Sequence, residues 1–239
     1  MEQLNSEEWG SLYNLKMLDG AISTINQRCY NVQTLEMLNL TNESDSVLEI
    51  GCGTGVSSIA LAQDGRKVVA MDYSQECLKL VSEIASRTGI KVDTIMHDAT
   101  IELPYSDKYF DVIFHAGLLE HFEFNERVEM LKLWRPKCKR MISLVPNAAS
   151  LTYRLGKHLL EKSNRWQFGI ENAIYTQSPE FTSAGYTVEK EYTVGIKEAM
   201  DFLPRWHWFR ICMSKLLDSN EFEDDCRQGY LLVTVGVTK

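Results

Sequence analysis

The residues best suited to binding a ligand stand in the glycine-rich stretch E-I-G-C-G-T-G, which runs from Glu49 to Gly55. Glycine lets the backbone pass close to a ligand because it has no Cβ atom. A helix that begins directly after such a turn also presents backbone N–H groups without partners inside the helix. We therefore predict a cofactor-binding turn formed by Gly51, Gly53 and Gly55, with Glu49 and Cys52 beside them.

Acidic residues end two later strand-like runs, and each could accept hydrogen bonds from a ligand. Asp72 ends the run K-V-V-A-M-D and precedes Tyr73, at a distance along the chain from the glycines that suits the hydroxyls of a ribose. Asp72 could also cap the helix that follows, and the two roles do not exclude each other. Asp98, beside Ala99, could accept a hydrogen bond from an adenine amino group or could simply form a turn.

Two small residues and two histidines lie at the end of a fourth run, F-D-V-I-F-H-A-G-L-L-E-H-F. Ala116 and Gly117 leave room for a ligand at the end of the strand. His121 lies just beyond the strand and is our first candidate for a general base, because histidine titrates near neutral pH. His115 is the second candidate. A structural hydrogen bond is the alternative role for His121.

An α/β sheet is needed to bring these residues together. Apolar runs and helical periodicity alternate along the chain, which predicts strands at 46–50, 67–72, 91–96, 111–116 and 140–145 and helices at 55–63, 75–87 and 122–134. Short connections of this kind imply parallel strands, which bind ligands at their carboxyl ends. Further strands are expected at 186–194 and 229–237, and one or two helices within 4–40.

Length and composition indicate one globular domain. The chain has 239 residues, of which 44% are apolar and 24% charged, enough for a full α/β domain with additions. We expect a single domain over 1–239, with an N-terminal helical cap at 1–43, a core at 44–147 and decorating segments at 148–180 and 195–228.

Net charge and cysteine content indicate which cellular compartment and which binding partners to expect. A net charge of −8 argues against general affinity for nucleic acid. The N-terminus lacks the basic and apolar regions of a secretion signal, and no apolar run is long enough for a membrane span, so we expect a cytoplasmic protein. Six cysteines without a C-x-x-C pair favour reduced thiols over disulfides or a metal site.

From about 47 to 147, the order and spacing of these elements resemble class I S-adenosylmethionine-dependent methyltransferases. The L-L-E-H-F and S-L-V-P-N segments resemble the ubiquinone-type (type 11) branch, which acts on small molecules, whereas K-C-K-R at 137–140 replaces a common glycine pair. The resemblance implies a doubly wound, mostly parallel seven-stranded sheet of order 3-2-1-4-5-7-6 with an antiparallel C-terminal hairpin. It also implies S-adenosylmethionine as cofactor, with the glycine loop around its methionine half, Asp72 at the ribose, and Asp98 with Ala99 at the adenine.

The implied activity is methyl transfer to an oxygen or nitrogen of a small-molecule acceptor. The segment 127–165 holds ten Lys or Arg against two Glu, so it is either a solvated surface or a sign of an acidic acceptor. The aromatic and basic run F-L-P-R-W-H-W-F-R could cover a lipid-like acceptor, pack on its own domain or form a homodimer interface. Two alternatives stay open: an NAD-dependent Rossmann oxidoreductase, against which Val56 counts, and a non-catalytic binding module.

Overall fold

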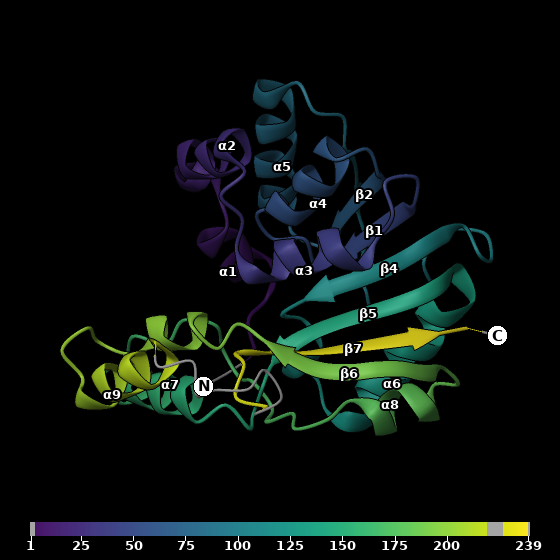
Figure 1. Ribbon diagram of the computed structural model, residues 1–239. Helices are drawn as coiled ribbons and strands as arrows, with labels where there is room; N and C mark the ends of the chain where they lie inside the picture. Colours follow the sequence, from purple (N-terminus) through teal and green to yellow (C-terminus); the bar gives the residue numbers. More distant parts are fainter. Residues whose placement is uncertain (1–2, 219–226, 239) are drawn as a thin grey trace.

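A seven-stranded sheet forms the centre of the computed structural model, which describes residues 3–218 and 227–238. The strands lie in the order β3-β2-β1-β4-β5-β7-β6 (Figure 1). Their bounds are β1 (Ser46–Ile50), β2 (Lys67–Asp72), β3 (Asp93–Met96), β4 (Phe110–Ala116), β5 (Cys138–Pro146), β6 (Thr187–Val194) and β7 (Leu231–Val237). Strands β1 to β5 pair in parallel, whereas β7 is antiparallel to both of its neighbours. The predicted sheet order and the antiparallel hairpin are confirmed.

The helices follow the predicted alternation, with a difference at the N-terminus. The described α-helices are α1 (Ser6–Leu12), α2 (Leu18–Gln27), α3 (Val32–Leu40), α4 (Val56–Gln63), α5 (Gln75–Thr88), α6 (Phe124–Trp134), α7 (Leu151–Lys162), α8 (Ser178–Ser183) and α9 (Trp208–Asp218). Short 3-10 turns are η1 (Leu15–Met17), η2 (Leu119–His121), η3 (Arg135–Lys137) and η4 (Glu198–Phe202). Three α-helices stand where one or two were expected, because Asn5, Asn14 and Asn31 each cap a new helical turn.

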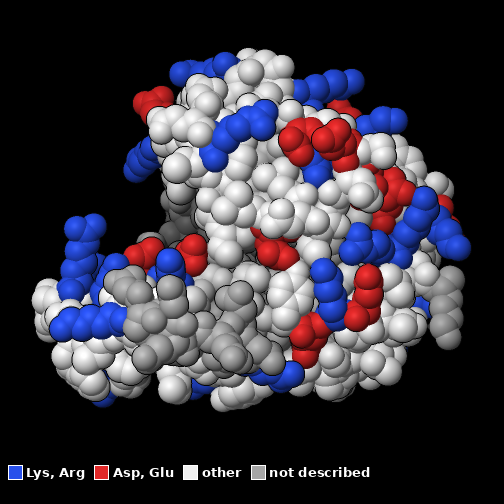
Figure 2. Space-filling model, viewed as in Figure 1, with Lys and Arg blue, Asp and Glu red and all other residues white. Residues whose placement is uncertain are grey.

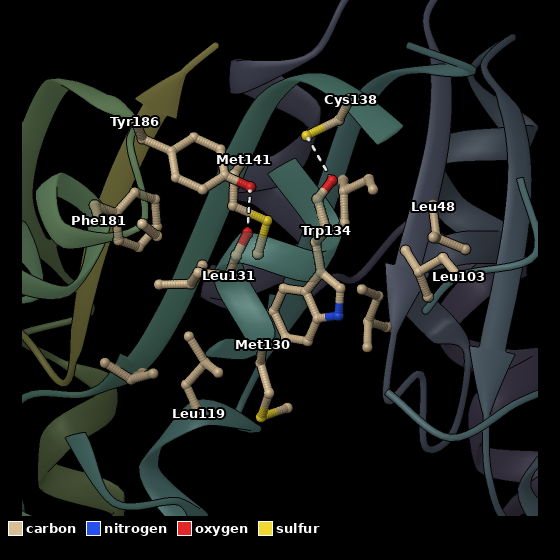
Figure 3. Packing of buried hydrophobic residues seen from close by; sticks show 14 of the residues in the cluster. Leu48, Leu103, Leu119, Met130, Leu131, Trp134, Cys138, Met141, Phe181 and Tyr186 are labelled. Carbon is tan, nitrogen blue, oxygen red and sulfur yellow. Dashed lines mark hydrogen bonds between the residues drawn. The ribbon is translucent and has the colours of Figure 1, made fainter. Parts of the chain in front are cut away.

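Alternate residues of the strands point to opposite faces of the sheet and build separate apolar clusters. Leu48 of β1 belongs to the cluster shown in Figure 3, which is completed by side chains of α6, α8 and β5. Val47, its neighbour, packs instead with α3 and α4. In the first cluster Trp134 is fully buried, and its indole N–H donates to the carbonyl oxygen of Ala99 at 3.0 Å. This bond fixes the loop after β3, where Asp98 also lies.

The two decorating segments meet in a lobe formed by α7, η4 and α9, beyond the carboxyl ends of the parallel strands (Figure 1). Helix α7 and η4 pack so closely that a Cβ atom at Gly156 would lie 2.4 Å from Cβ of Phe202. The aromatic and basic run is only partly packed on its own domain, since Trp206 and Trp208 are 79% and 68% exposed. Cys226 and the stretch 219–226 of the second segment lie outside the described residues. Among the described helices, none has the length and apolarity to cross a membrane.

Candidate functional site

A cavity of about 500 Å³ opens where β1, β2 and β4 end. It brings together most of the predicted site residues: Glu49, Gly51, Cys52, Gly53, Asp72, Tyr73, Asp98, Ala99, Ala116, Gly117 and His121. Two of the predicted residues, Gly55 and His115, do not line it. Helix α1, the stretch 166–171, Phe202 and Tyr230 complete the wall. The stretch 166–171 and Phe202 belong to the two decorating segments, and none of these residues was among the predicted site residues.

The glycine loop is held by Asp72. Gly51 and Gly53 have φ angles of +67° and +52°, which only glycine adopts without strain. The backbone N–H of Gly53 donates to Oδ2 of Asp72 at 2.9 Å, and the N–H of Ser74 donates to Oδ1 at 2.9 Å. Burial raises the pKa of Asp72, and these N–H donors oppose the rise. Asp72 therefore connects the loop to the start of α5, and its carboxylate lines the cavity.

Gly55 has a packing role that its sequence neighbours do not reveal. It caps the N-terminus of α4 with a φ angle of +67°. A Cβ atom at this position would lie 2.4 Å from Cγ2 of Val81 on α5. The missing side chain therefore lets α4 and α5 approach each other, and the structure does not bring Gly55 to the cavity.

Glu49 and Cys52 lie in the buried wall of the cavity. Oε2 of Glu49 accepts hydrogen bonds from the backbone N–H and the hydroxyl of Ser58, at 3.0 and 2.5 Å. Burial raises the pKa of Glu49 to about 8, so its carboxyl holds a proton at neutral pH unless a cation enters the cavity. Burial also raises the pKa of the Cys52 thiol well above its ordinary value, which keeps it uncharged.

Asp98 forms the turn that was one of its two predicted roles. Its Oδ1 accepts from the backbone N–H and the hydroxyl of Thr100, at 2.8 and 2.7 Å. The residue also lines the cavity beside Ala99. The turn therefore presents the carboxylate at the place where a ligand could reach it.

His121 is held in place by residues 170–172 of the first decorating segment. Its Nδ1 lies 2.7 Å from the carbonyl oxygen of Ile170, and the backbone N–H of Asn172 donates to the carbonyl oxygen of Glu120 at 2.7 Å. The rings of His121 and Trp9 of α1 form a T-shaped pair, with 5.2 Å between ring centroids. Burial lowers the pKa of His121, so the ring is neutral at pH 7.

Glu120 is the functional candidate that sequence reasoning missed. Its side chain is 3% exposed, and Oε2 has no hydrogen-bond partner among the described residues. Oε1 lies 3.9 Å from Nε2 of His121. Burial, followed by the nearby charge of Glu171, raises the pKa of Glu120 well above its ordinary value. The signal available in the sequence was the acid directly before His121 in L-L-E-H-F.

His115 lies in the interior of the sheet. Its side chain is fully buried in β4, and Nε2 is 2.8 Å from the hydroxyl oxygen of Ser143. Burial lowers the pKa of His115 to about 3. The ring therefore lies in the core, away from the cavity, and this position does not support a catalytic role for His115.

Comparison with known proteins matches residues 47–140 to a sequence family described as a methyltransferase domain. A ubiquinone biosynthesis O-methyltransferase from Rickettsia felis is 32% identical over 123 residues, covering 50% of this chain and 49% of the relative. An uncharacterized protein from Haemophilus influenzae is 26% identical over 174 residues, covering 73% of this chain and 59% of its own length. The chain thus spans about half the length of the curated relatives it matches.

Solved structures share the fold. The SAH-bound magnesium protoporphyrin IX methyltransferase from Synechocystis PCC 6803 has a TM-score of 0.59 at 16% identity, covering 98% of this chain and 93% of that one. The 4+2 cyclase SpnF has a TM-score of 0.64 at 15% identity, covering 100% and 98%.

The match of residues 47–140 to a methyltransferase domain agrees with the sheet order and the glycine loop, and this part of the chain is a class I S-adenosylmethionine-dependent methyltransferase domain. Its relation to the ubiquinone biosynthesis O-methyltransferases is distant.

Proposed function

We propose that this chain transfers the methyl group of S-adenosylmethionine to an oxygen or nitrogen of a small-molecule acceptor. One observation carries the proposal: the Asp72-held glycine loop and the buried, neutral His121 line the same cavity. A donor bound at the loop would therefore share an enclosed space with a base. The match of 47–140 to a methyltransferase domain favours this function over the NAD-dependent alternative.

The residues present fit the cofactor. Gly51 and Gly53 leave the loop open, and the buried Glu49 carboxyl behind them would become a counter-ion for a cationic group. Asp72 would accept the ribose hydroxyls, and Asp98 would accept the adenine amino group. When bound there, the cofactor supplies a methyl group on a positively charged sulfur, which needs no further activation.

His121 would act on the acceptor. A carbonyl oxygen can only accept, so the bond to Ile170 places the ring hydrogen on Nδ1 and leaves the lone pair of Nε2 free. Nε2 is then the atom that accepts a proton from the acceptor as it attacks the methyl carbon. Trp9 and Ile170 hold the ring in place, and alignment of the reacting atoms would supply most of the catalysis.

Calorimetry with S-adenosylhomocysteine, followed by turnover of S-adenosylmethionine with a panel of hydroxyl and amine compounds, tests the proposal. We expect binding in the micromolar range and release of S-adenosylhomocysteine with at least one acceptor. Absence of binding at millimolar concentration would refute the cofactor site. Binding without turnover over a broad panel would favour the non-catalytic binding module. The cyclase with a similar fold is an example of this fold with a different activity.

A further inference from the structure

We propose that the acceptor is an amine attached to an apolar or aromatic body, and that the carboxyl of Glu120 holds its nitrogen. The inference rests on the proposed methyl transfer and names the substrate class of that same cavity. It assigns to Glu120 the recognition of a positively charged nitrogen.

The first support is the charge of the lining. The described residues that line the cavity include no Lys or Arg, whereas five carry carboxyl groups: Glu49, Asp72, Asp98, Glu120 and Glu171. Glu49 and Asp72 lie beside the glycine loop, Asp98 lies in the turn after β3, and Glu120 and Glu171 lie near His121. An acceptor with a carboxylate or phosphate would meet no Lys or Arg side chain in this lining.

The basic segment 127–165 does not supply that partner. Its buried Arg127 bonds Glu180 at 2.8 Å, and Lys157 bonds Glu171 at 2.8 Å. Figure 2 shows Lys and Arg gathered on the outside of the lobe formed by α7 and α9. Positive charge is therefore either paired or on the surface, which does not support an acidic acceptor.

The second support is that Glu120 is buried without a partner. The carboxyl of Glu171 already accepts from the Tyr153 hydroxyl and from Lys157, at 2.5 and 2.8 Å. Oε2 of Glu120 has no such donor among the described residues. A buried polar atom without a hydrogen bond costs on the order of 1–3 kcal/mol, so a donor from a ligand would be favoured.

The carboxyl is also reachable from the strand end. A Cβ atom at Gly117 would lie 3.4 Å from Oε1 of Glu120, and the glycine leaves that side open. Ammonium groups supply up to three N–H donors, which matches two carboxyl oxygens and the nearby Nε2 of His121.

The third support is the aromatic wall around this carboxyl. Aromatic side chains from separate parts of the chain line the cavity: Trp9, Tyr13, Trp166, Phe168, Phe202 and Tyr230. Trp166 and Phe168 pack edge to face with ring centroids 5.2 Å apart, and Phe202 and Tyr230 pack at a tilt with centroids 5.0 Å apart. Such rings attract a cation over their faces and cover the apolar body that carries it.

The reaction balances with these residues. Glu120 releases its proton to solvent when the ammonium ion binds, and the carboxylate then pairs with the nitrogen. Nε2 of His121 takes one proton from the ammonium ion. The freed lone pair forms the new N–C bond while the C–S bond of the donor breaks and its electrons stay on sulfur. The proton on His121 then passes to solvent, and the product leaves as a methylated ammonium ion.

Calorimetry on the protein saturated with S-adenosylhomocysteine tests the assignment with three probes of one shape: 2-phenylethylamine, 2-phenylethanol and 3-phenylpropanoate. We expect the amine to bind at least about tenfold more tightly than the other two. Measurements in two buffers of different ionisation enthalpy should show release of one proton with the amine. In Glu120→Gln, amine affinity should fall about tenfold or more and the proton release should disappear.

Glu180→Gln is the matched control, because Glu180 is also a buried carboxyl with an unpartnered Oε2 but does not line the cavity. It should keep the amine preference and the proton release. Equal or tighter binding of the alcohol, or unchanged amine binding in Glu120→Gln, would overturn the assignment. S-adenosylhomocysteine binding is measured first in every variant, so failure of the cofactor site is distinguished from failure of the amine site.

Discussion

Nδ1 of His121 lies 2.7 Å from the carbonyl oxygen of Ile170, and this single bond determines which nitrogen of the ring can do chemistry. The carbonyl holds the hydrogen on Nδ1, so Nε2 faces Glu120 with a free lone pair. The bond also joins the first decorating segment to the turn that follows β4. It therefore holds His121 beside Glu171, which lines the same cavity.

Replacing His121 should separate catalysis from binding. In His121→Asn the amide N–H can still donate toward Ile170, but the lone pair of Nε2 is lost. We expect kcat to fall by about 10²–10⁴-fold, while the affinity for S-adenosylhomocysteine changes by less than about threefold. The wild-type kcat/KM should decline only below pH ~6.5, because burial lowers the pKa of His121. A decline that begins above pH 7 would contradict the assignment of His121 as the base.

Loss of Asp72 should weaken cofactor binding. Asp72→Ala removes both the acceptor for a ribose and the bond to Gly53 that holds the loop. We expect the affinity for S-adenosylhomocysteine to fall about tenfold or more by calorimetry. Asp19→Ala, at an exposed acid of α2, is the control and should leave the affinity unchanged. Equal affinities in the two variants would refute the ribose role.

Gly55 should matter for stability. Gly55→Ala forces a side chain into a φ angle of +67° and against Val81. We expect the free energy of unfolding to fall by about 2–4 kcal/mol in urea denaturation. Gly89→Ala has a similar φ angle of +69° with no atom within 4 Å of the added Cβ, and should cost only about 1–2 kcal/mol. Val81→Ala should relieve the clash, so the double variant Gly55→Ala/Val81→Ala should lose less free energy of unfolding than the sum of the losses in the two single variants. Losses that simply add would count against the packing role.

Glu49 should make the folded protein less stable as pH rises. An acid whose pKa is raised by folding binds its proton more tightly in the folded than in the unfolded chain. Its contribution to the free energy of unfolding therefore decreases between its ordinary value of 4.5 and its folded value of about 8. Asp72 and Glu120 act in the same direction, so the difference between wild type and Glu49→Gln isolates this residue.

Urea denaturation at pH 5.5 and pH 7.5 measures this difference. The variant should lose less stability than the wild type over that interval, by on the order of 2 kcal/mol. Parallel losses in the two proteins would show that Glu49 is not protonated in the folded state.

The sheet and the loop could be predicted because their signals are local. A β-branched run, a glycine turn and a helical period follow each other within 46–63, and the pattern repeats along the chain. The role of Gly55 could not be predicted in this way, because it depends on a contact with Val81 of a different helix. His115 is the last residue but one of β4, so the sequence placed it near the strand end, and only the structure shows that its side chain is buried against Ser143.

The aromatic wall of the cavity depends on packing between distant parts of the chain. Trp9, Trp166 and Tyr230 meet only after the N-terminal helix, the segment after α7 and the last strand have folded against one another. Each lies in a stretch whose local pattern indicates no ligand contact. Glu120 differs from them, because it directly precedes a predicted site residue, and its burial without a partner is visible only in the structure.

The distribution of the five tryptophans gives this protein an optical reporter of its own. Trp9 and Trp166 line the cavity, Trp134 is fully buried behind the sheet, and Trp206 and Trp208 face solvent. A molecule that fills the cavity therefore changes the environment of Trp9 and Trp166 directly, whereas Trp206 and Trp208 do not line the cavity. Emission from the unlabelled protein can thus follow occupancy in real time, and Trp9→Phe and Trp166→Phe would show which wall each ligand touches.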